Sequence, residues 1–339
     1  MNSVTTPADD LERLADLVHR QHPSVSNLLL MPDARYQTRT VTLDAVMREV
    51  TDCLAQGFRN RAAEDFPMLY CAWGKCRVGS TALTNLFGVA DMPSYFQPVK
   101  VVLRHALMGE TGAPWNVPAI AYHPVIFSKE MAGPYALAEC LFQPLQPLIE
   151  AGYPIDKLHF IMLDRDPASS LASWIEKWSD RVPDATLMQN FIISSLNKLR
   201  VESYAVRQGV PVTHYVYEAS KEPVTSIRAL FTCLGLAGRF TEGAVTEWNE
   251  MGKLNSKDAK ITFVKEPPVY TVPGLHSEDT AYRFHTRKTS SLSDERRDLL
   301  DRFGINDLYR ASVESCIRDL KLDFATAQRL FGDVIGVAA

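Results

Sequence analysis

The chain has 339 residues, 46% of them hydrophobic and 22% charged, which is typical of a globular protein with a large buried core. Its net charge of -4 gives no overall basic footprint, which argues against a nucleic acid partner. No apolar run approaches the roughly 20 residues that cross a bilayer, and the polar N-terminus lacks the apolar core of a signal peptide. We therefore expect a soluble cytoplasmic protein without a membrane partner.

Residues 1–66 are predicted to form a helical extension. Apolar side chains recur at helical spacing in two stretches, and Pro23 and Pro32 interrupt the region between them. One face of each predicted helix is therefore apolar and is expected to pack on the rest of the protein. The apolar positions are Leu11, Leu14, Leu17 and Val18 in the first stretch and Leu43, Val46, Met47, Val50 and Leu54 in the second.

Short apolar runs alternate with helical periodicity through the middle of the chain. This alternation predicts a three-layer α/β fold, in which helices cover a central parallel sheet and ligands bind beyond the carboxyl ends of the strands. The expected strands are residues 67–73, 120–128, 158–163 and 210–217, and the expected helices include 80–87, 135–150, 187–208 and one that begins at Pro167.

We expect residues 67–339 to form this α/β domain. Residues 252–287 are rich in Lys, Pro and Thr, show no clear period and are predicted to be a variable loop. Residues 292–330 are helical again.

The segment 74–81, with the sequence GKCRVGST, follows a predicted strand and opens a helix. Its two glycines have the spacing of the phosphate-binding loop G-x-x-x-x-G-K-[ST], but Ser80 stands where that loop has its lysine. Nucleotide triphosphatases place the lysine on the terminal phosphates, whereas backbone amides and a helix N-terminus suffice to bind an anion. Arg77 adds a positive charge within the loop. The alternative is a tight strand-to-helix turn without a ligand.

A second segment has complementary chemistry. Arg165 ends a predicted strand, Pro167 begins the next helix, and Ser173 lies eight residues after the arginine. The guanidinium and the hydroxyl are placed to converge on one anion, and the alternative is a surface ion pair beside a solvated serine.

Together the two segments resemble the cofactor signatures of sulfotransferases that use 3′-phosphoadenosine-5′-phosphosulfate (PAPS). The first, [KR]-x-G-[ST]-[ST], binds the 5′-phosphosulfate in that family, and the second, R-x-P with a later serine, binds the 3′-phosphate. The resemblance spans roughly residues 68–288. It implies a P-loop-like sulfotransferase fold, PAPS as the donor without a metal, and a small-molecule or carbohydrate acceptor. The residues matching the first motif are Arg77, Val78, Gly79, Ser80 and Thr81, and those matching the second are Arg165 and Ser173.

Two later segments are similar to further family motifs. Tyr217 opens YEASKEP, which resembles Y-E-D-x-K-x-x-P, whose tyrosine lies near the adenine; the aspartate is replaced by Ala219. Arg287 and Lys288 resemble the basic pair of R-K-G that holds the 3′-phosphate, although Thr289 replaces the glycine.

The resemblance also implies catalytic roles. Arg77 is expected to stabilise the charge that develops on the departing phosphate. The family's K-T-H segment, which carries the base, is absent. Near the end of the expected strand 120–128, Lys129 is a candidate for the leaving oxygen, and His123 and Glu130 are alternative candidates for the base. Gln97 stands where some carbohydrate enzymes have a glutamate in the acceptor pocket.

Two other functions compete with sulfuryl transfer. One is a P-loop kinase or nucleotidase, which the serine at position 80 argues against. The other is a binding protein that retains the fold without turnover. Six cysteines show no metal-ligand spacing, so no metal site is expected. The acceptor and the oligomeric state stay open.

Overall fold

A computed structural model describes residues 38–39, 41–248, 261–267, 280–286 and 292–336 of the chain. Its six strands are all parallel and lie in one sheet with the order β5-β4-β1-β3-β2-β6. The predicted α/β class and parallel sheet are therefore confirmed. The strands are β1 (Met68–Lys75), β2 (Ser94–Phe96), β3 (Val125–Ala132), β4 (Leu158–Asp164), β5 (Val212–Val216) and β6 (Ile261–Phe263).

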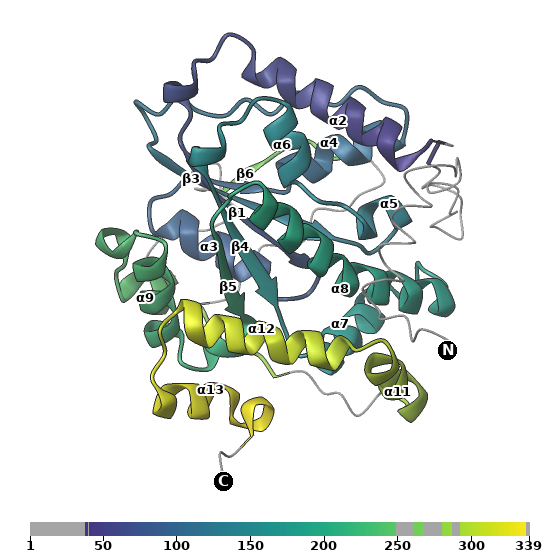
Figure 1. Cartoon of the computed structure of the whole chain (residues 1–339), viewed down its shortest axis with the longest axis vertical. Coiled ribbons are helices and arrows are strands. Elements are labelled where there is room, and N and C mark those ends of the chain that lie inside the picture. Colours follow the sequence, from purple (N-terminus) through teal and green to yellow (C-terminus); the bar gives the residue numbers. More distant parts are fainter. Residues whose placement is uncertain (1–37, 40, 249–260, 268–279, 287–291, 337–339) are drawn as a thin grey trace.

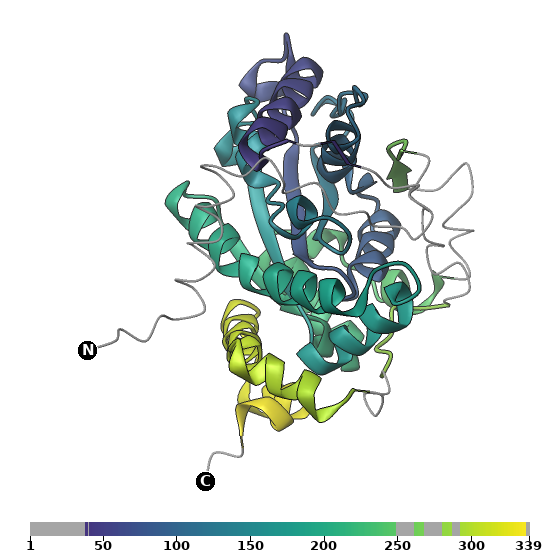
Figure 2. The same ribbon diagram turned by 90° about the vertical axis from the view of Figure 1, so that its right-hand side faces the viewer.

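Helices cover both faces of the sheet (Figures 1 and 2). Their buried side chains pack with those of the strands into two separate apolar cores. The arrangement is the expected three-layer one. One face carries α2 (Leu43–Phe58), α4 (Pro98–Leu107), α5 (Leu137–Cys140), α6 (Leu145–Glu150), α7 (Pro167–Trp178), α8 (Asp184–Arg207) and α11 (Asp294–Arg302). The other carries α3 (Ser80–Val89), α9 (Pro223–Cys233), α10 (Gly243–Thr246) and α13 (Phe324–Ile335), while α12 (Ile305–Asp319) also packs against the edge strand β5.

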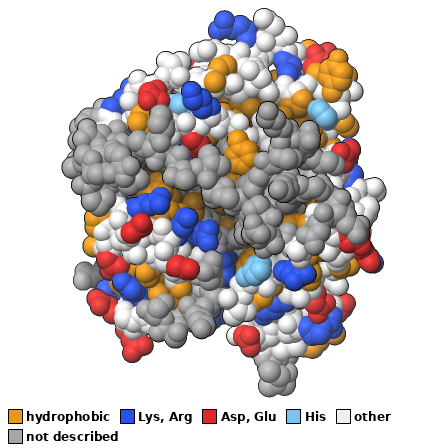
Figure 3. Space-filling view, turned by 180° about the vertical axis from the view of Figure 1, so that it is seen from behind, with side chains coloured by type: hydrophobic (Ala, Val, Ile, Leu, Met, Phe, Trp, Pro, Cys, Tyr) orange, Lys and Arg blue, Asp and Glu red, His pale blue; other side chains and the backbone are white. Residues whose placement is uncertain are grey.

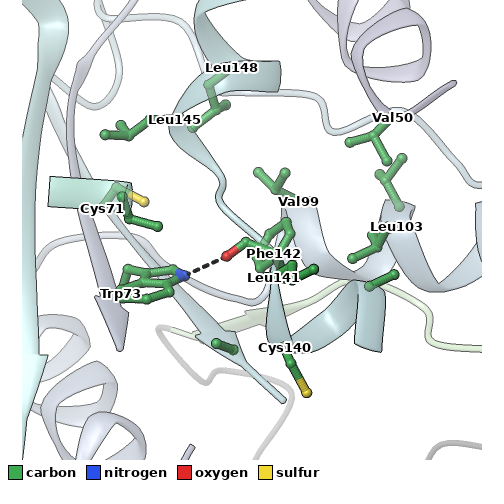
Figure 4. Close-up of a cluster of buried hydrophobic side chains, with 14 of the residues drawn as sticks. Val50, Cys71, Trp73, Val99, Leu103, Cys140, Leu141, Phe142, Leu145 and Leu148 are labelled. Carbon is green, nitrogen blue, oxygen red and sulfur yellow. Dashed lines mark hydrogen bonds between the residues drawn. The ribbon is translucent and has the colours of Figure 1, made fainter. Parts of the chain in front are cut away.

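The core on the α2 side contains the periodic residues of the second N-terminal stretch, and Figure 4 shows part of it. Trp73 of β1 lies at its centre with no exposed surface, and its ring nitrogen donates to the carbonyl of Phe142 at 3.2 Å. This bond satisfies the one polar atom of an otherwise apolar side chain. Helix α2 therefore belongs to the same packed layer as the other helices on this face of the sheet. The first predicted helical stretch, with Leu11 to Val18, lies outside the described residues.

Several boundaries differ from the sequence-based ones because proline and glycine interrupt the apolar patterns. The expected helix 135–150 is two short helices, with Pro144 just before the second. Strand β3 begins only after Pro124 and continues to Ala132. The C-terminal helical region is broken at Gly304, whose φ of 64° suits glycine. Of the variable segment 252–287 the structure describes residues 261–267 and 280–286, and these include the short strand β6.

The carboxyl ends of β4 and β5 point toward the end of the molecule where α7 and α12 lie (Figure 1). Positive and negative side chains are mixed over the face seen in Figure 3, in keeping with a net charge near zero. Within the described ranges, none of the helices has both the length and the apolar character needed to cross a bilayer.

Candidate functional site

The glycine loop joins β1 to α3 with two residues in the left-handed region, Arg77 (φ 71°) and Gly79 (φ 77°). Gly79 is also the N-cap of α3 and has no side chain with which to cap it. In the part of the chain that is described, the amides of Gly79, Ser80 and Thr81 have no hydrogen-bond acceptor. Uncapped amides at a helix N-terminus attract an anion. The loop therefore has the donors that a phosphate or sulfate requires.

Gly79 is required for its packing as well as for its backbone angle. A Cβ at this position would lie 2.2 Å from Cδ2 of Tyr217, far inside ordinary contact distance. The loop and the chain after β5 therefore approach each other more closely than any other residue at position 79 would permit.

The two predicted anion-binding segments meet at Arg77. Its Nε donates to Oγ of Ser173 at 2.9 Å, and its carbonyl accepts from Nη1 of Arg165 at 3.2 Å. Ser173 and Arg165 are almost fully buried, with 1% and 6% of their surface exposed. The site thus brings two guanidinium groups and a buried hydroxyl together from segments nearly ninety residues apart in sequence.

Tyr217 completes this cluster. The guanidinium of Arg165 lies 4.5 Å from the centre of its ring, and its hydroxyl accepts from the amide of His285 at 2.9 Å. Arg165 Nη2 in turn donates to the carbonyl of His285 at 3.3 Å. His285 is a site residue that sequence reasoning missed, because it lies in an aperiodic segment with no strand or helix to place it.

Lys129 also reaches the loop, from β3. Its Nζ donates to Oγ1 of Thr81 at 3.0 Å and lies 3.9 Å from the ring centre of Phe96. None of the described carboxylates lies within ion-pair distance of it. Burial lowers the pKa of Lys129 to about 7; the Cys76 thiol opposes this shift, and nearby cations, Lys100 among them, add to it. This poorly compensated cation makes the space beside the loop favourable to an anion.

Glu130 faces away from Lys129, because consecutive residues of a strand point to opposite sides of the sheet. Its carboxylate accepts from the amides of Val99 and Lys100 at 2.9 and 3.0 Å and has no exposed surface. It therefore holds the N-terminus of α4, and the structure does not bring it to the glycine loop beside Lys129.

Burial raises the pKa of Glu130 to about 8, although the two amides of α4 favour the ionised form. The folded protein then binds a proton that the unfolded chain has released, so between about pH 4.5 and 8 this group lowers the free energy of unfolding as the pH rises. Glu130→Gln removes the titration, so we expect its melting temperature relative to wild type to increase from pH 5 to pH 8. Calorimetric melts at four pH values measure this, and a constant difference would contradict it.

The remaining predicted residues lie apart from this cluster or outside the description. His123 is exposed and precedes β3, at the opposite end of the strand from the loop, so the geometry does not support it as a base. The buried Gln97 adopts left-handed angles (φ 55°) between β2 and α4. Arg287 and Lys288 lie outside the described residues.

The residues available for a divalent metal are few. Asp164, the acidic residue at the end of β4, is buried and forms an ion pair with Lys75. Over the described ranges, no group of three His, Cys, Asp or Glu side chains has an arrangement that holds a metal ion. The carboxylate of Asp164 is thus already occupied by a protein cation.

We compared the chain with family models, with curated proteins and with solved structures, and none of the three comparisons found a match.

Proposed function

We propose that this protein transfers a sulfuryl group from PAPS to a hydroxyl or amine of a small-molecule or carbohydrate acceptor, on a P-loop-like sulfotransferase fold. The observation that carries the proposal is the junction of Arg77, Arg165 and Ser173 beside a helix N-terminus whose first amides have no acceptor among the described residues. PAPS presents two anionic groups, a 3′-phosphate and a 5′-phosphosulfate. The donors fit PAPS because they form two sets. One set is the loop amides with Lys129, and the other is Arg165, directly after β4, with Ser173 on α7.

Sulfuryl transfer is an in-line displacement at sulfur, in which the acceptor's oxygen or nitrogen bonds to sulfur as the bond to the phosphate oxygen breaks. Arg77 and Lys129 would stabilise the negative charge that grows on that oxygen. Preorganised donors in a water-poor site are worth more than in bulk solvent. His123 and Glu130 lie elsewhere and do not serve as the base. In this proposal the proton of the attacking hydroxyl or amine passes to another group of the sulfuryl acceptor or to water.

The chemistry of the loop favours this proposal over phosphoryl transfer. A P-loop kinase places a lysine directly after the second glycine and uses an acidic residue for magnesium. Here Ser80 follows Gly79, and Asp164 is neutralised by Lys75. Thermal protection by 3′-phosphoadenosine-5′-phosphate (PAP), but not by ATP with magnesium, is the expected result. Protection by ATP with magnesium alone would reverse the assignment.

A measurement of turnover distinguishes a sulfotransferase from a protein that only binds the nucleotide. Incubation with labelled PAPS and a panel of alcohols, phenols, sugars and amines should transfer label to at least one acceptor. PAP binding without transfer to any acceptor, and without slow hydrolysis of PAPS, would favour a protein that only binds the nucleotide.

Arg165→Ala and Ser173→Ala should each weaken PAP binding, because each removes a hydrogen bond to a charged group worth about 1–3 kcal/mol. This corresponds to roughly a 5- to 150-fold increase in Kd. Isothermal calorimetry measures the change, and Arg228→Ala is the matched control because that exposed arginine binds Glu242 on the surface. Unchanged PAP affinity in both site variants would remove the basis of the proposal.

We also propose a cytoplasmic location. All six cysteines are described and none is in a disulfide, which fits a reducing compartment. Most of them are buried, and burial raises the pKa of thiols such as Cys53, so they behave as inert apolar side chains.

A further inference from the structure

A buried polar cluster lies directly beneath the two anion-binding segments. Lys75, the last residue of β1, forms an ion pair with Oδ1 of Asp164, the last residue of β4, and the same oxygen accepts from the amide of Arg165 at 2.8 Å. The side chains of Lys75 and Asp164 have only 5% and 7% of their surface exposed. The pair therefore joins the strand that leads into the glycine loop to the strand that leads into Arg165.

Two helices supply the remaining partners of Asp164. Oγ of Ser312, on α12, lies 2.5 Å from Oδ2, and Nζ of Lys198, on α8, donates to that hydroxyl while remaining 3.8 Å from the carboxylate. Burial would raise the pKa of Asp164, but Lys75 and Lys198 outweigh it and hold the pKa below its ordinary value. The carboxylate is thus charged and shared between two lysines.

The hydroxyl of Ser312 separates the second lysine from the carboxylate. Without it, Lys198 would compete directly with Lys75 for Asp164, since an unpaired buried ammonium is costly. Movement of Asp164 toward Lys198 would release both Lys75 and the amide of Arg165. The geometry of the candidate anion site would therefore depend on Ser312 of α12, which lies outside that site.

We infer that Ser312 and Asp164 are positioning residues, through which α12 holds the glycine loop and Arg165 at the spacing that the bound anion requires. This inference rests on the proposed function for the identity of the ligand, but the positioning itself can be measured without any ligand.

The experiment compares Ser312→Ala in the full chain with two matched variants. Ser312→Thr retains the hydroxyl. Ser195→Ala removes another buried helix hydroxyl from the same neighbourhood: Ser195 lines a 10 Å³ cavity beside Lys198, and its hydroxyl donates to the carbonyl of Phe191 one turn back rather than to Asp164. The two readouts are hydrogen exchange of the two protected amides at the ends of the loop, Cys76 (bonded to the carbonyl of Ala132) and Leu83 (bonded to the carbonyl of Gly79), and the Kd of PAP.

We expect Ser312→Ala to accelerate loop exchange and to raise the Kd of PAP, each by about fivefold or more. Ser312→Thr should restore both values, and Ser195→Ala should change neither. Equal values for Ser312→Ala and Ser195→Ala in both readouts would overturn the inference. If the wild type itself fails to bind PAP, the proposed function fails, and the exchange rates alone then decide the positioning role.

Discussion

Gly79→Ala is expected to abolish tight PAP binding, with Kd increased more than about 100-fold, because the loop must move away from Tyr217. The new Cβ would lie 2.2 Å from Cδ2 and 2.6 Å from Cε2 of that ring. Displacing Tyr217 also disturbs Arg165, which stacks on it. Left-handed angles at a non-glycine residue add a cost of about 1–3 kcal/mol to the folded state.

Gly209→Ala is the control for the backbone cost alone. Gly209 has nearly the same φ, 73° against 77° for Gly79, and a Cβ there would have no atom within 4 Å. Urea denaturation should show a loss of stability in both variants and a larger one for Gly79→Ala. Calorimetry should show normal PAP binding by Gly209→Ala only. Similar stability losses combined with intact PAP binding by Gly79→Ala would show that the contact with Tyr217 does not shape the site.

Lys129→Met should lower sulfuryl transfer by about 100- to 1,000-fold, since it removes a preorganised cation at the leaving group. It should not lower the melting temperature, because burying this ammonium is itself unfavourable and methionine fills a similar volume. Loss of turnover together with unchanged or increased stability is the pattern expected of a functional rather than a structural lysine. A large loss of stability would contradict this interpretation.

The lowered pKa of Lys129 predicts a dependence on pH. The ammonium loses its proton as the pH rises through about 7, so PAP affinity should fall above that value, by at most about tenfold per pH unit. Lys129→Arg stays charged throughout this range, and its affinity should stay flat between pH 7 and 9. The phosphates of PAP titrate in the same way with every variant, so any difference between the two profiles belongs to residue 129.

The sequence predicted the main architecture because the long parallel strands are continuous apolar runs that can be recognised locally. Arg77, Arg165 and Tyr217, which the family resemblance assigns to one nucleotide, follow β1, β4 and β5, and the structure brings them together. Those three strands are neighbours in the sheet, so residues beyond their carboxyl ends converge.

The catalytic assignments on β3 were harder to predict because they depend on where the strand begins and ends. The expected strand stopped at residue 128, whereas β3 continues to Ala132 and places Lys129 and Glu130 inside it. Alternation then sends only Lys129 toward the loop. The role of Ser312 was invisible for a different reason: its contact with Asp164 joins residues 148 positions apart, and no local pattern marks it.

The edge strand β6 has a consequence for folding during synthesis. β6 pairs with β2, although about 160 residues of chain separate them, and both strands are only three residues long. A nascent chain that has not yet reached residue 261 leaves the backbone groups along one side of β2 without their final partner, and open edges of this kind promote association between chains. Ribosome-bound intermediates of this protein should therefore be more prone to association until residues 261–263 have emerged and can pair with β2.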